Sequence, residues 1–389
     1  MKNYNRMTKL FTTASAAAVL AGGSLVAGDY GKAVIDDKMP IEADPWTICN
    51  VFDHTTLYEG DGFIEKVKII GRYQGQFHDV SDNLNSSSRR WDHRRWRAGV
   101  QVDMANDLKF KSTFNLDTSP NFDANRFVRT VEEMVIEWEP SEDFYVIIGK
   151  QKPAITREYA TSSKKILTFE RSQIVNEVVA DKSWGVAVGF AAAGLNHEVG
   201  VFANTYDNDW ATTNFNGGAM LTYRTSAQIT EATEIFFDYQ YNDVNDMNAA
   251  VGNAAGSGSA YEHVLALGTE SEFGAFGLVT DIIYAADKNG NGPDTHGFVV
   301  MPSYDITDKL QFVAKYAYMD RGALQRPQSR VGGEANDFTD LHTFYAGFNY
   351  RICGDQLKLM AGYEYATGED GTGADYNSDS WLVGVRTYW

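Results

Sequence analysis

Residues 95–116 read RWRAGVQVDMANDLKFKSTFNL, and polar and apolar side chains alternate along this stretch on both sides of a short turn at residues 105–107. Successive side chains of a β-strand point to opposite faces, so each half has one apolar and one polar face. The apolar face carries Trp96, Ala98, Val100, Val102 and Met104 before the turn and Leu108, Phe110, Phe114 and Leu116 after it. The stretch therefore predicts an antiparallel hairpin whose two faces meet different surroundings.

The same two-residue period recurs from Phe63 to the end of the chain and predicts sixteen strands. An apolar face opposite a polar face is typical of a transmembrane barrel, where strands contact lipid on one side and line a lumen on the other. We expect strands at residues 63–77, 95–104, 108–116, 128–138, 143–149, 183–191, 196–204, 217–225, 233–241, 261–271, 275–285, 296–305, 309–319, 341–352, 356–366 and 380–389.

The connections between these strands alternate in length. Those after odd-numbered strands are long, such as 76–92 and 117–127, and most after even-numbered strands are short, such as 353–355. Bacterial outer-membrane barrels have short periplasmic turns and long outer loops, whereas a soluble sandwich has no reason for this rhythm. The sequence therefore predicts an all-β, 16-stranded antiparallel transmembrane β-barrel, closed by a last strand that ends on Trp389.

Residues 1–27 have the three parts of a secretory signal peptide. Lys2, Arg6 and Lys9 precede a stretch of small and apolar residues that ends near Ala27. A membrane anchor is the alternative, but the stretch is short for a spanning helix. Residues 28–62 lack strand periodicity, and we interpret them as an N-terminal periplasmic segment before a barrel at 63–389. We therefore expect a protein of the bacterial outer membrane, in contact with its lipid and lipopolysaccharide.

The overall charge and the scattered polar residues exclude several other functions. The formal net charge is -18, and loss of three signal-peptide cations would bring it to -18 - 3 = -21, which disfavours nucleic acid as a partner. Aromatic residues make up 13% of the chain, enough for the two interfacial girdles of a barrel. No Ser-His-Asp set, zinc motif or nucleotide fingerprint appears, so we expect neither enzyme activity nor a cofactor.

One loop has a weak likeness to a calcium site. Asp287, Asn289 and Asn291 alternate as in the first half of a calcium loop, but Phe298 stands where the closing Glu is needed. A hairpin loop rich in turn residues is the simpler interpretation, and we expect no metal site.

The connection at residues 150–183 lies between the fifth and sixth expected strands and has neither strand alternation nor a helix-length apolar stripe. Residues 150–184 hold seven basic and four acidic side chains, or 7 - 4 = +3, in an acidic chain. A long insert inside a compact fold is usually functional. We predict that this third outer loop folds into the lumen and controls what passes.

The two cysteines stand far apart in the sequence. Cys49 precedes the first strand and Cys353 lies in the turn between the fourteenth and fifteenth, so both are expected in the periplasm. Barrel closure brings the first strand near the last ones, and an exported chain meets an oxidising compartment. We therefore predict a Cys49–Cys353 disulfide, with two free thiols as the alternative.

The insert and its flanks resemble the phosphate-selective porin O and P family. The matching elements are Ile148-Gly149-Lys150-Gln151-Lys152-Pro153, Thr161-Ser162-Ser163, Thr168-Phe169-Glu170-Arg171, Asn176, Asp181-Lys182, Gly185-Val186 and the earlier Arg94-Arg95-Trp96-Arg97-Ala98-Gly99-Val100. The resemblance implies a sixteen-stranded barrel, a homotrimer, an inward-folded third outer loop and passive diffusion of phosphate-like small anions past basic side chains.

These basic side chains fall into two groups. The resemblance places Lys150, Lys152, Arg157, Lys164, Lys165 and Arg171 at the constriction, and strand parity adds Arg72, Arg95, Arg97, Lys109 and Lys111 on the adjacent wall. Arginine suits phosphate through its fork of donors, and lysine acts as a point charge. The alternative is that they pair with nearby acids, as basic residues of lumen walls commonly do.

The acidic residues leave two other functions open. Strand parity also points Asp103, Asp238, Asp281 and Glu364 into the lumen, and the outer loops are acidic. A general or weakly cation-selective diffusion porin is therefore the first alternative. A non-conducting structural or adhesive barrel is the second.

Overall fold

The computed structural model describes residues 47–83, 87–117, 127–180, 182–203, 219–243, 261–287, 294–325, 338–370 and 373–389. The proposed signal peptide and most of the N-terminal segment lie outside these residues. No helix among the described residues is long and apolar enough to cross a membrane.

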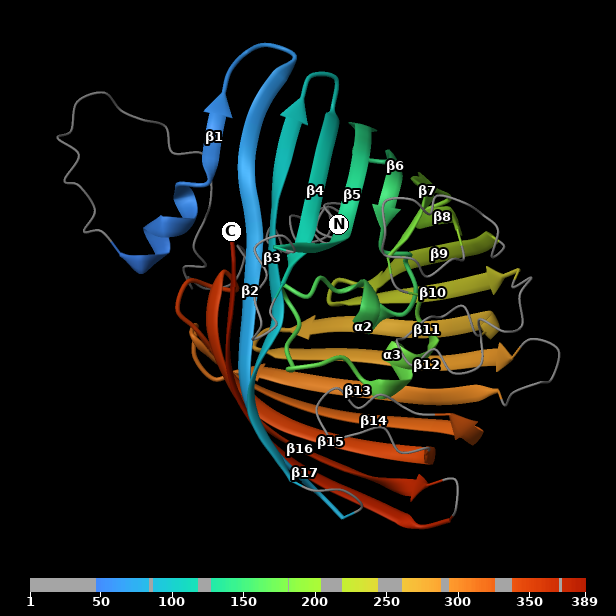
Figure 1. Cartoon of the computed structure of the whole chain (residues 1–389). Coiled ribbons are helices and arrows are strands. Elements are labelled where there is room, and N and C mark those ends of the chain that lie inside the picture. The colour runs from blue at the N-terminus through green and yellow to red at the C-terminus, as the bar shows by residue number, and fades with distance from the viewer. Residues whose placement is uncertain are drawn as a thin grey trace.

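Sixteen antiparallel strands form a closed barrel, as predicted (Figure 1). Each strand pairs with the next, and β17 pairs with β2, so the wall has no open edge along this seam. The strands are β2 (Ile64–Asp82), β3 (Ser88–Met104), β4 (Leu108–Leu116), β5 (Val128–Ser141), β6 (Phe144–Gln151), β7 (Ser183–Ala192), β8 (Leu195–Ala203), β9 (Ala219–Thr230), β10 (Thr233–Asn242), β11 (Tyr261–Phe273), β12 (Phe276–Asp287), β13 (Thr295–Asp305), β14 (Leu310–Gln325), β15 (Phe338–Arg351), β16 (Leu357–Asp370) and β17 (Asp375–Tyr388).

The two-residue period sorts side chains between lumen and lipid. On β12, Asp281 and Ile283 point inward and are buried, whereas Ile282 between them points outward and is 62% exposed. The outward face of an isolated chain is exposed where lipid would cover it, so exposed apolar side chains are expected there. Apolar residues thus serve two surfaces: the lipid-facing band and, as at Ile283, the packing of the barrel interior.

The predicted end of the first strand and start of the second strand were wrong. β2 continues to Asp82 and β3 begins at Ser88, so the long connection expected at 76–92 is mostly strand. Charged residues of this stretch face each other across the hairpin, where Asp79 lies directly opposite Arg89 and 2.7 Å from it. Opposite charges on neighbouring strands attract, and they stabilise the extended pairing.

Part of the N-terminal segment is ordered against the barrel. Residues 48–53 form a 3₁₀ helix, η1 (Ile48–Asp53), and β1 (Thr56–Glu59) pairs with β2 next to Lys66 and Lys68. β17 pairs with β2 only from Arg72 onward, so β1 covers an edge that β17 does not reach. The sequence prediction missed this short strand because four residues are too few to show a period.

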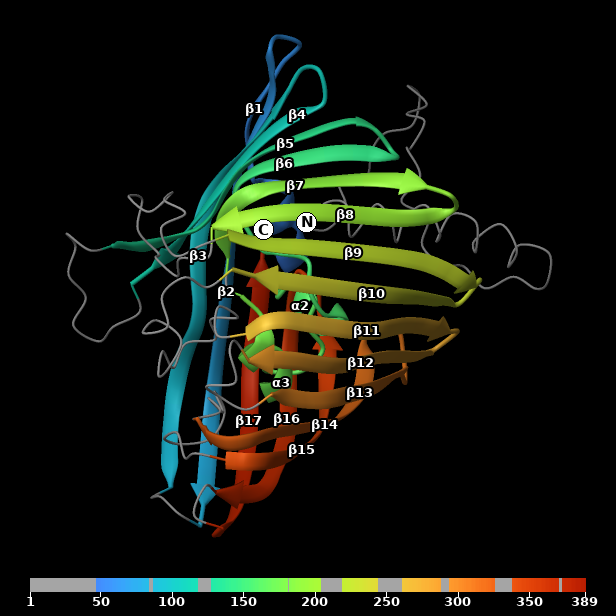
Figure 2. The ribbon, with the colours of Figure 1, turned by 90° about the vertical axis from the view of Figure 1, so that its right-hand side faces the viewer.

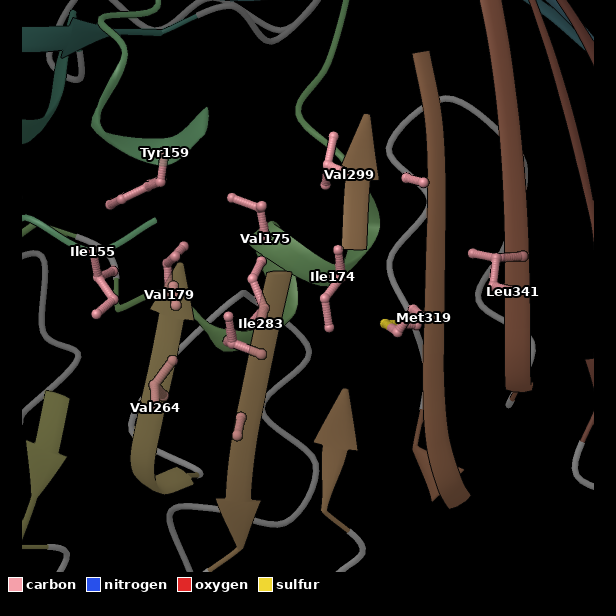
Figure 3. Packing of buried hydrophobic residues seen from close by; sticks show 14 of the residues in the cluster. Ile155, Tyr159, Ile174, Val175, Val179, Val264, Ile283, Val299, Met319 and Leu341 are labelled. Atoms are coloured by element: carbon pink, nitrogen blue, oxygen red, sulfur yellow. The ribbon is translucent and has the colours of Figure 1, made fainter. Parts of the chain in front are cut away.

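The insert folds into the lumen, as predicted. It contains two short helices, α2 (Arg157–Ala160) and α3 (Gln173–Val178), and both lie inside the ring of strands (Figures 1 and 2). Ile174 and Val175 are fully buried against wall residues such as Ile283 and Met319 (Figure 3). Burial of this apolar surface stabilises the loop inside the barrel.

The complete apolar cluster joins the loop to one side of the wall. Its members are Ile155, Tyr159, Ile174, Val175, Val178, Val179, Tyr261, Val264, Ala266, Ile283, Ala285, Val299, Ala317, Met319, Leu341, Ala366 and Tyr376. The loop therefore packs on the strands β11–β17 through apolar contacts. It meets the strands on the other side of the lumen through polar contacts.

The predicted disulfide is confirmed. Cys49 in η1 is bonded to Cys353 in the turn before β16, with Cα atoms 5.5 Å apart and a sequence separation of 304 positions. The bond ties the N-terminal segment to the end of the barrel that carries the short turns.

Digestion without reduction should yield one disulfide-linked peptide pair that contains Cys49 and Cys353, because the two sulfur atoms are bonded in the folded chain. Mass spectrometry of the purified, alkylated protein measures this. Quantitative alkylation of both thiols before reduction would contradict the assignment, and the same digest after reduction is the control.

Candidate permeation site

The wall holds the first helix of the loop at its N-terminus. Both carboxylate oxygens of Asp281 on β12 accept backbone hydrogen bonds, from the N–H groups of Arg157 and Glu158, at 2.7 Å each. These N–H groups belong to the first turn of α2 and have no partner inside the helix. The predicted lumen acid Asp281 therefore anchors the loop.

The residue before α2 adopts an unusual conformation. Thr156 has a φ of 54°, a left-handed backbone that β-branched residues rarely adopt. Its hydroxyl accepts from the Tyr159 N–H at 3.1 Å, and its carbonyl accepts from the Arg224 guanidinium at 3.0 Å. Such a conformation persists where surrounding contacts determine it. The contact with Arg224 helps direct the chain from β6 into the lumen.

Three predicted anion-binding residues bind backbone carbonyls. Lys152 donates to the carbonyls of Tyr159 and Ala160, which end α2. Arg171 donates to two carbonyls of the same loop at 3.2 and 2.7 Å. Lys150 donates to a carbonyl of β5 at 2.9 Å and is 2% exposed. These three cations satisfy backbone acceptors of the loop and of the wall.

A network of ion pairs covers the wall at β3–β5. Glu133 accepts from both Lys111 and Lys182. Glu132 lies 3.1 Å from Lys182 and 2.8 Å from Arg97. Arg97 and Lys111 therefore face the lumen, as predicted, but each is paired with an acid.

A β-bulge brings in an arginine that the sequence prediction missed. Gln74 pairs with Arg95 and the next residue of β2 pairs with His93, so Arg94 is an extra residue in β3. Parity alone places Arg94 outward, beside Trp96. The bulge turns it inward, where its guanidinium forms two hydrogen bonds with Glu170 of the loop. In the sequence, the Arg94-Arg95 doublet is the one signal that could have indicated the bulge and the inward position of Arg94.

The remaining predicted residues also contact other groups. Arg72 donates to the hydroxyl of Ser163 in the loop, and Arg95 donates to the Gln74 side chain at 2.7 Å and lies 4.0 Å from Glu170. Lys109 lies 3.9 Å from Glu137. Arg157 pairs with Glu270 of β11. Lys165 is exposed.

A cavity of about 720 Å³ lies between the loop and the barrel end that carries the short turns. Five of the eleven predicted residues line it: Lys109, Lys111, Arg157, Lys164 and Lys165. Arg351 is a sixth cation in its lining, and six acids match them: Glu137, Glu158, Glu270, Glu272, Asp305 and Asp355. The charged side chains around this space therefore balance, with 6 - 6 = 0.

Lys164 differs from the other cations of the cavity. Its Nζ lies 4.7 Å from the centre of the Tyr388 ring, and among the described residues it has no carboxylate partner. An aromatic face attracts a cation without neutralising its charge. Lys164 thus presents an ammonium group to the cavity that a solute can approach.

The predicted lumen acids face inward but are largely engaged. Asp238 pairs with Arg224, Asp281 binds the loop, and Asp103 lies 3.8 Å from Lys68. Glu364 is partly buried. Paired acids contribute less to the field in the lumen than their number suggests.

In the described part of the chain, no group of three or more His, Cys, Asp or Glu side chains is placed so that it could hold a metal ion. Asp287 ends β12, and the other two residues of the weak calcium-loop candidate, Asn289 and Asn291, lie outside the described residues.

A closed sixteen-stranded barrel with a polar loop folded across its lumen defines a class, the porins, which are channel proteins of the bacterial outer membrane. More particularly, the chain belongs to the phosphate-selective porin O and P family, whose family model matches residues 67–336. The resemblance read from the insert is thereby confirmed.

Solved porin structures share the fold at low identity. The outer membrane channel DcaP of Acinetobacter baumannii is 12% identical, with a TM-score of 0.59 over 85% of this chain and 99% of that chain. An anion-selective porin from Comamonas acidovorans is 12% identical, with a TM-score of 0.58 over 83% of this chain and 99% of that chain. OprB of Pseudomonas putida is 14% identical, with a TM-score of 0.59 over 83% and 94%. No curated protein matches the chain.

Proposed function

We propose that this porin passes small anions, phosphate-like solutes among them, and that Lys164 is the main group that attracts them. The main observation in support is the position of the Lys164 ammonium, which lines the cavity without a carboxylate partner among the described residues. Arg72 and Lys111 each repel its charge more strongly than Glu133 attracts it. The field of a few charges is concentrated in a narrow space with low-dielectric walls.

Family membership and one structural relative support this proposal. The family is described as phosphate-selective, and the Comamonas acidovorans porin with the same fold is described as anion-selective. A single moderate site also suits conduction, because a solute must be able to leave after it binds.

A general or weakly cation-selective porin is the second candidate. The balanced charges of the cavity lining favour it, and Glu272 is an exposed acid in that lining. The sign of the reversal potential in planar bilayers under a salt gradient separates the two candidates. A barrel that inserts but does not conduct would support the structural or adhesive alternative.

The Lys164→Met variant should lose much of the anion preference and of the block of chloride current by added phosphate, because it removes a cavity ammonium group that has no carboxylate partner among the described residues. Reversal potential and phosphate titration in planar bilayers measure both effects. Lys309→Met is the matched control, since Lys309 is exposed in a short turn and is absent from the cavity lining. Equal loss in both variants, or in neither, would contradict the role of Lys164.

Anion preference should also fall as the pH rises through about 7. Lys164 lies in the loop, outside the spanning strands, and burial followed by repulsion from Arg72 and Lys111 lowers its pKa to about 7. A lysine carries its charge below its pKa, so the attraction is present in acid and is lost in alkali. An ordinary lysine has a pKa of about 10.4, so reversal potentials measured from pH 5.5 to pH 8.5 test this shift. A profile that is unchanged in Lys164→Met would assign the titration to another group.

We also propose that the porin is a homotrimer. The trimer form of OmpT of Vibrio cholerae shares the fold, with 15% identity and a TM-score of 0.52 over 83% of this chain and 99% of that chain. Light scattering of the protein in detergent, after size exclusion and correction for bound detergent, should give three times the mass of the mature chain. A protein mass of one chain at every concentration would refute the trimer.

A further inference from the structure

A row of loop carbonyls is bound by four adjacent strands of the wall. The segment at residues 166–170 follows Lys164 and Lys165 and crosses the inner face of β14–β17. Four of its five carbonyl groups each accept a hydrogen bond from a different strand. The donors are Lys358 of β16 to Ile166 at 2.9 Å, Asn349 of β15 to Leu167 at 3.0 Å, Arg386 of β17 to Phe169 at 3.2 Å and Lys315 of β14 to Glu170 at 2.8 Å.

These donors are buried, so a permeating solute does not reach them directly. Lys358, Asn349, Arg386 and Lys315 are between 1% and 3% exposed. Two also lie near acids, with Lys358 3.3 Å from Asp355 and Lys315 3.5 Å from Glu158. A buried carbonyl without a donor is unfavourable, so each bond holds its part of the loop to the wall.

Just before the segment, the loop is also fixed to β2, the strand that pairs with β17. Ser163 is bound twice by β2, its hydroxyl by Arg72 and its carbonyl by Gln74 at 2.7 Å. Lys164 stands between this attachment and the row of carbonyls, two residues before Ile166. The wall contacts that precede and follow Lys164 in the sequence therefore determine where its ammonium group lies.

We propose that Lys358, Asn349, Arg386 and Lys315 are positioning residues that hold residues 166–170 against the wall and so set the cross-section of the channel. In this proposal the charges of Lys358, Arg386 and Lys315 do not attract the solute. The claim that these residues position Lys164 for anions rests on the proposed function. The claim that they hold the loop against the wall does not.

The test compares Lys358→Met, which removes a charge, with Asn349→Leu, which removes an uncharged donor. Both should raise single-channel conductance, broaden its distribution and admit larger neutral sugars in liposome swelling, because both release the same segment. Lys358→Arg keeps a charged donor and should behave as the parent protein, and Lys309→Met is the control for loss of a distant charge.

The opposite pattern would overturn the proposal. In that case Lys358→Met would shift the reversal potential toward cations with conductance and sugar uptake unchanged, and Asn349→Leu would have no effect. If Lys358→Met fails to fold, Asn349→Leu by itself still tests the positioning role.

A second readout is independent of conduction. Both native cysteines form the disulfide, so Ser162→Cys introduces a single thiol at the cavity lining. Maleimide should label it faster when Lys358→Met or Asn349→Leu is added, and an unchanged rate in both would refute the positioning role. If the parent channel proves unselective while labelling still accelerates, the anion path fails and the positioning role stands.

Discussion

Every buried backbone N–H and C=O group needs a partner, and this constraint governs both the barrel and its loop. In lipid the strands satisfy it through closure of the ladder from β2 to β17. The loop inside the lumen has only two short helices, so many of its carbonyls and N–H groups must find partners on the wall. Asp281 supplies acceptors, and Arg224, Lys315 and Lys358 supply donors.

The same constraint changes how the basic residues of the lumen are interpreted. Lysine and arginine are long donors that reach loop carbonyls from a curved wall, and several of them do so here, such as Lys315 and Lys358. Others form ion pairs, as Lys111 does with Glu133. A count of lumen cations therefore overstates the field that a solute meets, because many of these cations are paired with acids or bound to carbonyls.

Much of the architecture was predictable because the two-residue period is local. Sixteen strands, the inward loop and the disulfide followed from alternation, loop lengths and closure. The errors have equally local causes. A bulge at Arg94 shifts parity by one residue, charged strands between Phe77 and Asp92 look like a loop, and β1 is too short to show a period.

The sequence by itself determined the class of fold, because side-chain parity states which face meets lipid and which meets the lumen. It also placed the basic residues in and around the insert. Only the tertiary structure decided which cations hold the loop and which face the cavity. That choice depends on contacts between residues more than 100 positions apart, such as Lys358 with Ile166, and no local pattern encodes the distance between two such groups.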